Sequence, residues 1–507
     1  MSENSQKTKK LTLMSLILMI FTSVFGFGNM PRSFYLMGYA SIPWYILSGL
    51  TFFIPYAFMM AEYGAAFKDE KGGIYSWMEK SVGPKYAFVG TFMWYTSYII
   101  WMVSVCSSQW VTISNAIFGK DTTSTWGVLG LNSTQVLGIL GIIWIILVTC
   151  TVSKGIEKIT KMTSIGGTAV ALLNIVLLVS AIIVFIANGH PLEPITSAKV
   201  FIESPNPAYQ TPVSVLAFIV FAIFGYGGIE VIGGLVDQTE NAEVTFPKGI
   251  TIAAIVISVG YSIGLFLCGV VTNWNAALSS DKVHMGNITY ALMNNLGYQL
   301  GQAFGMSDAA SIVLGQWVSR FVGLSMFLAL TGAFFTLSYS PLKQIIEGTP
   351  KKLWPGKMAE IKDGMPLNAM RIQCIIVIAF IALVSFGGDA AAKFFAKLTL
   401  MTNVAMTIPY MFLSGAFISF KKNDNIKKPF EIYKTKRSTI IATVIVTFTV
   451  TFANFFTIIE PATKGNISDT MISILGPVFF SVVAIMMYNS YEKKYVIESK
   501  EGKTKNI

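Results

Sequence analysis

The sequence predicts an all-α membrane protein with twelve transmembrane helices, and three observations lead to that fold. Of the 507 residues, 53% are hydrophobic and only 12% are charged, and the mean hydropathy is +0.60. A soluble chain of this length needs more charge to cover its surface. The apolar residues form runs long enough to cross a bilayer, and basic residues gather in alternate gaps between the runs. We therefore expect one membrane domain.

The spans follow from the length of the apolar runs. A hydrocarbon core of about 30 Å requires about 20 helical residues. The first run follows the polar, basic residues 1–10 and is longer than the apolar part of a signal peptide, so we expect it to remain as a span. The predicted spans are 11–39, 43–67, 86–117, 134–152, 156–188, 213–236, 248–273, 311–340, 368–387, 391–420, 438–459 and 470–490.

The distribution of basic residues predicts the orientation. Most of the 37 Lys and Arg residues lie in the two ends of the chain and in every second gap between spans. The opposite gaps contain only Lys120, Lys199, Lys282, Lys393 and Lys464. Because cytoplasmic segments are enriched in Lys and Arg, both termini are expected in the cytoplasm of a cell with this protein in its inner membrane. The net charge of +11 then follows from topology, and no nucleic-acid partner is expected.

Residues that would support enzyme chemistry are sparse. The four cysteines lie in apolar runs without the spacing of a metal site, and His190 and His284 are far apart in predicted loops. The spans contain no nucleophile–base pair or paired carboxylates. The sequence therefore predicts no enzyme, no cofactor and no metal site.

Two spans contain features that break helices at mid-depth. In the first span, Gly26 and Gly28 are followed by Pro31, which lacks a backbone donor. In the sixth span, residues 221–230 read FAIFGYGGIE, with three glycines before a carboxylate. Close helix packing through small residues is one explanation of such glycines. The other is that both helices are interrupted, which inside a bilayer requires partners for the freed peptide groups.

The two clusters lie five spans apart, which has a topological consequence. Repeats with an odd number of spans enter the membrane in opposite directions, so 11–188 and 213–420 would be inverted copies within a ten-helix core. Residues 421–490 would add two helices, and 1–10 and 491–507 would be cytoplasmic tails. Transporters with this architecture bind substrate where the two broken helices meet. Freed N–H groups there suit a carboxylate and freed carbonyls suit an ammonium group.

Several segments resemble a known family. Residues 223–230, continuing through 238–241 to 246–248, are similar to the sixth-span signature of the amino acid–polyamine–organocation superfamily. Residues 71–77 resemble its loop between spans two and three. The resemblance extends from about residue 11 to 420, and 29–32 is most similar to the bacterial glutamate/γ-aminobutyrate antiporter branch.

The resemblance implies roles for particular residues. Phe224 would close over the substrate, and Glu230 would link protonation to transport. Many relatives carry a lysine in span five where this chain has Val170, which puts coupling through that lysine in doubt. The implied substrate-binding residues are Val24, Gly26, Phe27, Gly28, Phe224, Gly225, Gly227 and Gly228. Tyr98, an aromatic residue of span three, is added as a second candidate gate.

Four charged residues are predicted to lie within spans, where charge is costly and usually faces a cavity: Arg32, Glu230, Arg320 and Lys397. They could share one vestibule, in which Arg32 or Arg320 binds a second substrate carboxylate or pairs with Glu230. The alternatives are a fixed structural ion pair, or snorkelling of Arg32 and Lys397 toward the interface.

Together these features predict a secondary active transporter, an antiporter or a proton-coupled permease, that carries amino acids or related amines by alternating access. The alternatives are an ion-coupled symporter of another small organic solute, a channel, and a sensor without transport. Apart from its substrate and the lipid bilayer no partner is predicted, and the protein is expected to be a monomer or a homodimer.

Overall fold

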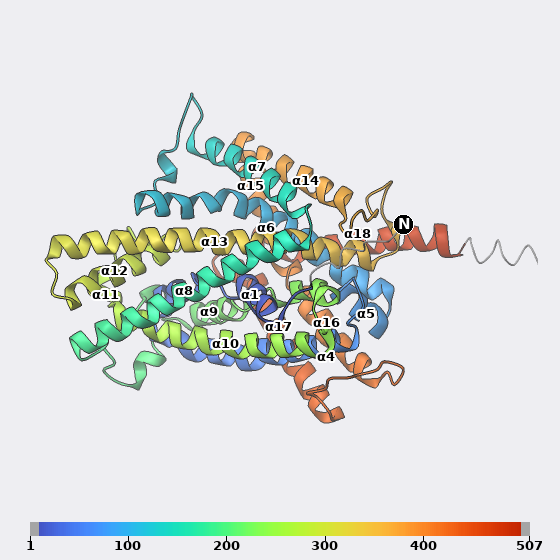
Figure 1. Ribbon diagram of the computed structural model, residues 1–507, viewed down its shortest axis with the longest axis horizontal. Helices are drawn as coiled ribbons and strands as arrows, with labels where there is room; N and C mark the ends of the chain where they lie inside the picture. The colour runs from blue at the N-terminus through green and yellow to red at the C-terminus, as the bar shows by residue number, and fades with distance from the viewer. Residues whose placement is uncertain (1–9, 498–507) are drawn as a thin grey trace, which may run out of the picture.

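The computed structural model describes residues 10–497, whose regular secondary structure is helical. Ten stretches within these residues are long and apolar enough to span a membrane. One of them, Leu13–Ala66, has 54 residues, far more than the 20 or so needed for one crossing. Figure 1 shows the long helices lying side by side along the long axis of the molecule. The chain is therefore an all-α, multi-pass membrane protein.

The predicted spans all fall on helical segments. The helical elements that the following description uses are α1 (Leu13–Val24), α2 (Asn29–Met37), α3 (Ser41–Ser48), α4 (Ile54–Ala66), α5 (Ile74–Ser81), α6 (Pro84–Phe118), α7 (Ser133–Val152), α8 (Ile156–Asn188), α9 (Pro212–Phe224), η6 (Ile229–Gln238), α10 (Ala242–Val271), α11 (Trp274–Ala277), α12 (Ile288–Ala303), α13 (Asp308–Gly348), α14 (Leu367–Phe386), α15 (Gly388–Ala405), α16 (Ile408–Lys422), α17 (Lys436–Thr463) and α18 (Ile467–Tyr491).

The first span is interrupted at the glycine cluster. α1 ends at Val24, Phe25 is extended, and α2 begins at Asn29. Pro31 lies in the first turn of α2, where backbone N–H groups have no partner within the helix in any case. The proline therefore starts the second half of the span at little cost, after the glycines have allowed the chain to leave the first half.

The sixth span is interrupted in the same way. α9 ends at Phe224 and η6 begins at Ile229. Gly228 has a backbone φ of +114°, which residues other than glycine rarely adopt. A Cβ at this position would also collide with the Ser23 carbonyl oxygen. Glycine is thus required at this position for two independent reasons, and the second reason shows that the two interruptions touch.

The predicted span over 391–420 contains an interruption that was not predicted. α15 ends at Ala405 and α16 begins at Ile408, with Met406 and Thr407 between them. Pro409 is in the first turn of α16 and supplies no backbone donor to the preceding turn. A third span is therefore interrupted, and the Gly228 N–H of the second interruption donates to the hydroxyl of Tyr410 in the first turn of α16 (3.0 Å).

Two helices between the spans mark the two ends of the bundle. α5 lies in the predicted cytoplasmic gap that follows α4, and α12 lies in a predicted outer segment before α13. Figure 1 shows α12 with α11 at one end of the molecule and α5 at the other. These ends are named the α12 end and the α5 end below.

Small residues allow α8 and α13 to cross closely. A Cβ on Gly332 of α13 would lie 3.1 Å from the Met162 carbonyl oxygen and 3.3 Å from Gly166 Cα of α8. Thr163 adds hydrogen bonds to the Gly332 carbonyl (3.1 Å) and to the Thr336 hydroxyl (2.9 Å). Lipid is as apolar as the helix faces, so close packing and hydrogen bonds rather than the hydrophobic effect hold such helices together. The α8–α13 pair is therefore a fixed frame beside the interrupted helices.

Candidate functional site

One tyrosine joins the two glycine-rich interruptions. The hydroxyl of Tyr261, on α10, accepts a hydrogen bond from the Gly26 N–H (2.9 Å) and donates one to the Gly225 carbonyl (3.0 Å). Asn29 Nδ2 and the Val24 carbonyl are at 3.3 Å from the same oxygen. The tyrosine ring stacks on Phe25, with ring centroids 4.5 Å apart. Peptide groups freed at the two interruptions are thus partly satisfied by one buried hydroxyl.

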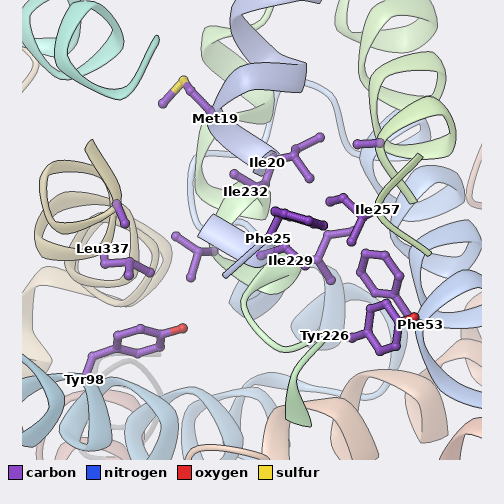
Figure 2. Close-up of a cluster of buried hydrophobic side chains, with 14 of the residues drawn as sticks. Met19, Ile20, Phe25, Phe53, Tyr98, Tyr226, Ile229, Ile232, Ile257 and Leu337 are labelled. Atoms are coloured by element: carbon purple, nitrogen blue, oxygen red, sulfur yellow. The ribbon is translucent and has the colours of Figure 1, made fainter. Parts of the chain in front are cut away.

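The aromatic surroundings of the interruptions are visible in Figure 2. Phe25 and Ile229 lie together, and Phe53 and Tyr226 stack beside them with ring centroids 4.8 Å apart. Tyr98 approaches this cluster from α6 with its hydroxyl group foremost.

Glu230 is fully buried beside the second interruption. Its Oε1 accepts hydrogen bonds from Trp94 Nε1 and from the Tyr98 hydroxyl, both at 3.1 Å. Its Oε2 accepts one from the Gly228 N–H at 3.2 Å, which also donates to the Tyr410 hydroxyl at 3.0 Å. The carboxylate therefore fixes Tyr98 and the backbone turn at Gly228 in one network.

A cavity of about 200 Å³ lies beside this network. It is smaller than the roughly 300–1,000 Å³ of pockets that hold drug-sized ligands, so it suits a smaller solute. Among the residues that the structure describes, the lining contains no lysine, arginine or carboxylate. The lining residues are Ser23, Tyr98, Trp101, Phe224, Gly227, Gly228, Leu337, Met406, Thr407 and Tyr410.

A second and larger cavity, of about 510 Å³, lies toward the α12 end. Met285, which precedes α12, and Glu460 near the end of α17 are among its lining residues. Phe224, Met406 and Thr407 line both cavities. The Phe224 side chain therefore lies at the boundary between the small cavity and the larger one.

On the opposite side of the small cavity, toward the α5 end, side chains lock the helices together. Lys343 of α13 is 1% exposed, and it forms an ion pair with Asp237 and a 2.8 Å hydrogen bond to the Gly234 carbonyl, both of η6. Gln344 accepts a hydrogen bond from the Ile74 N–H at 2.9 Å. These contacts join η6, α13 and α5 on the α5 side of the small cavity, while the larger cavity extends toward the α12 end.

Only some of the predicted substrate-binding and gating residues line a cavity in the structure. Tyr98, Phe224, Gly227 and Gly228 line the small cavity, and Phe224 and Gly225 line the larger one. The first-span set, Val24, Gly26, Phe27 and Gly28, lines neither of these two cavities. The Gly26 N–H, which the resemblance assigns to a substrate carboxylate, is bonded to Tyr261 here.

The four charged residues are not brought together. Arg32 is half-buried in α2, and its Nε donates to the Met285 carbonyl at 3.3 Å. Arg320 binds the end of α6: its Nε lies 3.3 Å from the Ile117 carbonyl oxygen and its Nη2 3.5 Å from that of Phe118. Lys397 is exposed on α15. Arg320 therefore caps a helix C-terminus, where a cation is favourable, and does not face Glu230.

Several lining residues were not among the predicted site residues. Ser23 stands at the edge of the first glycine cluster, and Trp101 follows Tyr98 by one helical turn, so both had a local signal. Met406 and Thr407 form the third interruption and Tyr410 follows it. Pro409 is the residue from which this interruption could have been predicted. Leu337 lies inside a long apolar helix, and nothing in the sequence distinguishes it from its neighbours.

Comparison with known proteins gives a consistent result. The model of the amino acid permease family matches residues 11–480. The chain is 57% identical to the inner membrane transporter YjeM of Escherichia coli over 486 residues, 95% of this chain and 96% of the relative. It is 24% identical to the aspartate/glutamate permease AcaP of Lactococcus lactis subsp. cremoris, over 86% of this chain and 85% of the relative.

A glutamate/γ-aminobutyrate antiporter of Lactococcus lactis subsp. lactis is 22% identical, over 88% of this chain and 83% of the relative. The resemblance found in the sequence is thereby confirmed, and the relatives are transporters rather than enzymes. Because the family match covers nearly the whole chain, this multi-pass membrane protein belongs to the amino acid permease family of the amino acid–polyamine–organocation superfamily.

Proposed function

We propose that the protein is a secondary active transporter of amino acids or related amines that works by alternating access, as an antiporter or a proton-coupled permease. The observation that carries the proposal is the small cavity that lies against the second interruption, with Phe224 at its boundary. Freed peptide groups beside a cavity of this size suit a small zwitterion.

The proposal includes the finer architecture. The long stretch Leu13–Ala66 counts as two spans, and α15 with α16 counts as one interrupted span, which brings the ten candidates to twelve. We propose that the first ten form two inverted repeats of five, with interruptions in spans one and six, and that both termini are cytoplasmic. The α5 end is then the cytoplasmic end, and the arrangement described above corresponds to a state that faces outward.

The chemistry of the cavity supports a substrate with an uncharged side chain. Two relatives are named for acidic amino acids, aspartate or glutamate. A second carboxylate in a water-poor cavity requires a cation or several donors. The described lining of the small cavity supplies Trp101, Leu337 and Met406, and none of its described residues is a lysine or arginine. We therefore expect this chain to prefer neutral amino acids over glutamate.

The proposal is tested by counterflow in liposomes that contain the purified protein. Vesicles loaded with one unlabelled compound are mixed with its labelled form, over a panel of neutral amino acids, glutamate, γ-aminobutyrate and diamines. The panel is measured at acidic and neutral pH, with and without sodium. Saturable counterflow of neutral amino acids is expected. Sodium-dependent uptake of another solute would favour an ion-coupled symporter, and conductance without saturation would indicate a channel.

The coupling mechanism is tested on Glu230, a carboxylate with donors around it and no basic side chain among its hydrogen-bond partners. In a proton-coupled permease, Glu230→Gln abolishes the difference in uptake between acidic and neutral pH while exchange at fixed pH continues. In an obligate antiporter, neither the wild type nor Glu230→Gln gives net uptake into empty vesicles.

A further inference from the structure

A second polar pocket lies far from the transport cavity, at the α5 end between the end of α16 and the start of α17. Its volume is about 210 Å³. Its polar lining includes Lys421, Lys422, Lys434, Lys436 and Glu431. The four lysines exceed the single glutamate by three positive charges, and the buried Glu62 behind Lys421 reduces the excess to two. The pocket is therefore suited to an anion.

The lysines differ in whether they already have partners. Lys421 forms ion pairs with Glu62 (2.7 Å) and Glu431 (2.6 Å). Lys422, Lys434 and Lys436 are exposed and form no ion pair with any residue between 10 and 497. An enrichment of lysine on this side of the membrane follows from topology, but topology does not require three of them to surround one cavity.

The wall of the pocket is held rigidly by Glu62. This side chain is fully buried near the end of α4. Its Oε1 accepts hydrogen bonds from the backbone N–H groups of Ile432 (2.8 Å) and Tyr433 (2.7 Å), while Oε2 binds Lys421. The segment before α17 is thus fixed against α4 and α16. Because the wall is already ordered, a ligand would bind without the entropic cost of ordering a loop.

An apolar stripe continues from the pocket along α17. Ile440, which lines the pocket, Val444 and Phe448 are 39%, 57% and 68% exposed. Their spacing of four residues places them on one face of the helix. Together they extend roughly 12 Å from the pocket toward the bilayer centre, at about 1.5 Å per residue.

We propose that this pocket binds the headgroup of an anionic phospholipid, with the phosphate among Lys422, Lys434 and Lys436 and one acyl chain along Ile440, Val444 and Phe448. Basic pockets between transmembrane helices on the cytoplasmic side suit such headgroups, and each lysine near the surface adds attraction for anionic lipid. The junction of the anion pocket with a lipid-facing stripe favours a phospholipid over a free phosphate compound, which has no use for the stripe.

The test uses the full-length protein, delipidated in detergent and titrated with phosphatidylglycerol or phosphatidylethanolamine, with bound lipid counted by native mass spectrometry. The wild-type protein is expected to bind phosphatidylglycerol at least roughly tenfold more tightly than phosphatidylethanolamine. The variant Lys422→Gln/Lys434→Gln/Lys436→Gln is expected to lose this preference. The control Lys351→Gln/Lys357→Gln/Lys362→Gln removes the same charge from exposed residues outside the pocket and is expected to keep it.

Each alternative has its own result. Equal loss in both triple variants would mean general attraction to a basic surface and would overturn the site, as would unchanged binding in the pocket variant. Displacement of phosphatidylglycerol by an equal concentration of glycerol phosphate would identify a free phosphate ligand and overturn the lipid assignment. Equal affinity of wild type for short-chain and long-chain phosphatidylglycerol would overturn the role of the stripe. Thermal melting of all three proteins shows that the comparison is between folded proteins.

Discussion

Tyr261 offers a direct test of how the two interrupted helices are held. Replacement of Tyr261 by phenylalanine keeps the ring that stacks on Phe25 and removes only the hydroxyl between Gly26 and Gly225. The two shorter hydrogen bonds, at 2.9 and 3.0 Å, would be lost. At a net 0.5–1.5 kcal/mol each, their loss costs about 2 kcal/mol, which is a factor of roughly 30 in an equilibrium constant.

The assay is counterflow of whichever neutral amino acid the wild type exchanges fastest, in liposomes with matched protein content. We expect the kcat/KM of Tyr261→Phe to fall roughly ten- to thirtyfold, because the interruptions must keep their relative position to bind the substrate. Tyr86→Phe is the matched control. It also removes one hydroxyl, which donates to the Phe412 carbonyl at 2.7 Å, away from the interruptions.

Thermal melting in detergent separates an effect on transport from an effect on folding. If the Tyr261 hydroxyl positions the interruptions, Tyr261→Phe remains folded and transports more slowly than Tyr86→Phe. Equal transport by the two variants would show that the Tyr261 hydroxyl does not position them.

Three further substitutions test other parts of the structure. Lys343→Met leaves the Asp237 carboxylate, whose side chain is 14% exposed, without its partner, so melting in detergent should show a loss of at most about 3–5 kcal/mol, the cost for a fully buried pair, and a second change, Asp237→Leu, should restore much of it. Gly332→Leu forces α13 away from Gly166 and is expected to cost roughly 1–3 kcal/mol or more and to lower the yield of folded protein, whereas Gly332→Ala should cost less. Arg320→Gln removes the cation at the end of α6 and should lower stability by about 1 kcal/mol without changing the ratio of neutral to acidic substrates in counterflow; a changed ratio would return Arg320 to the binding site.

The features that depend on local composition could be predicted from the amino-acid sequence. In lipid every backbone polar group must find a partner within the protein, and apolar runs of about 20 residues satisfy this as helices, so they predict helical spans whatever their neighbours are. The interruptions near Gly26 and Gly228 were predictable for a similar reason, since glycine and proline change the local cost of leaving a helix. The interruption before Pro409 carried the same kind of signal but was not predicted.

The tertiary structure alone decided which groups face the cavity and which are already occupied. The Gly26 N–H is engaged by Tyr261, a residue 235 positions away, and Arg320 reaches the end of α6 rather than Glu230. Leu337 lines the cavity although nothing in the sequence distinguishes it from the other apolar residues of α13. Such pairings depend on how helices distant in the chain are rotated and placed against one another, and a hydropathy pattern in lipid leaves that rotation unspecified, because packing and hydrogen bonds between the helices set it.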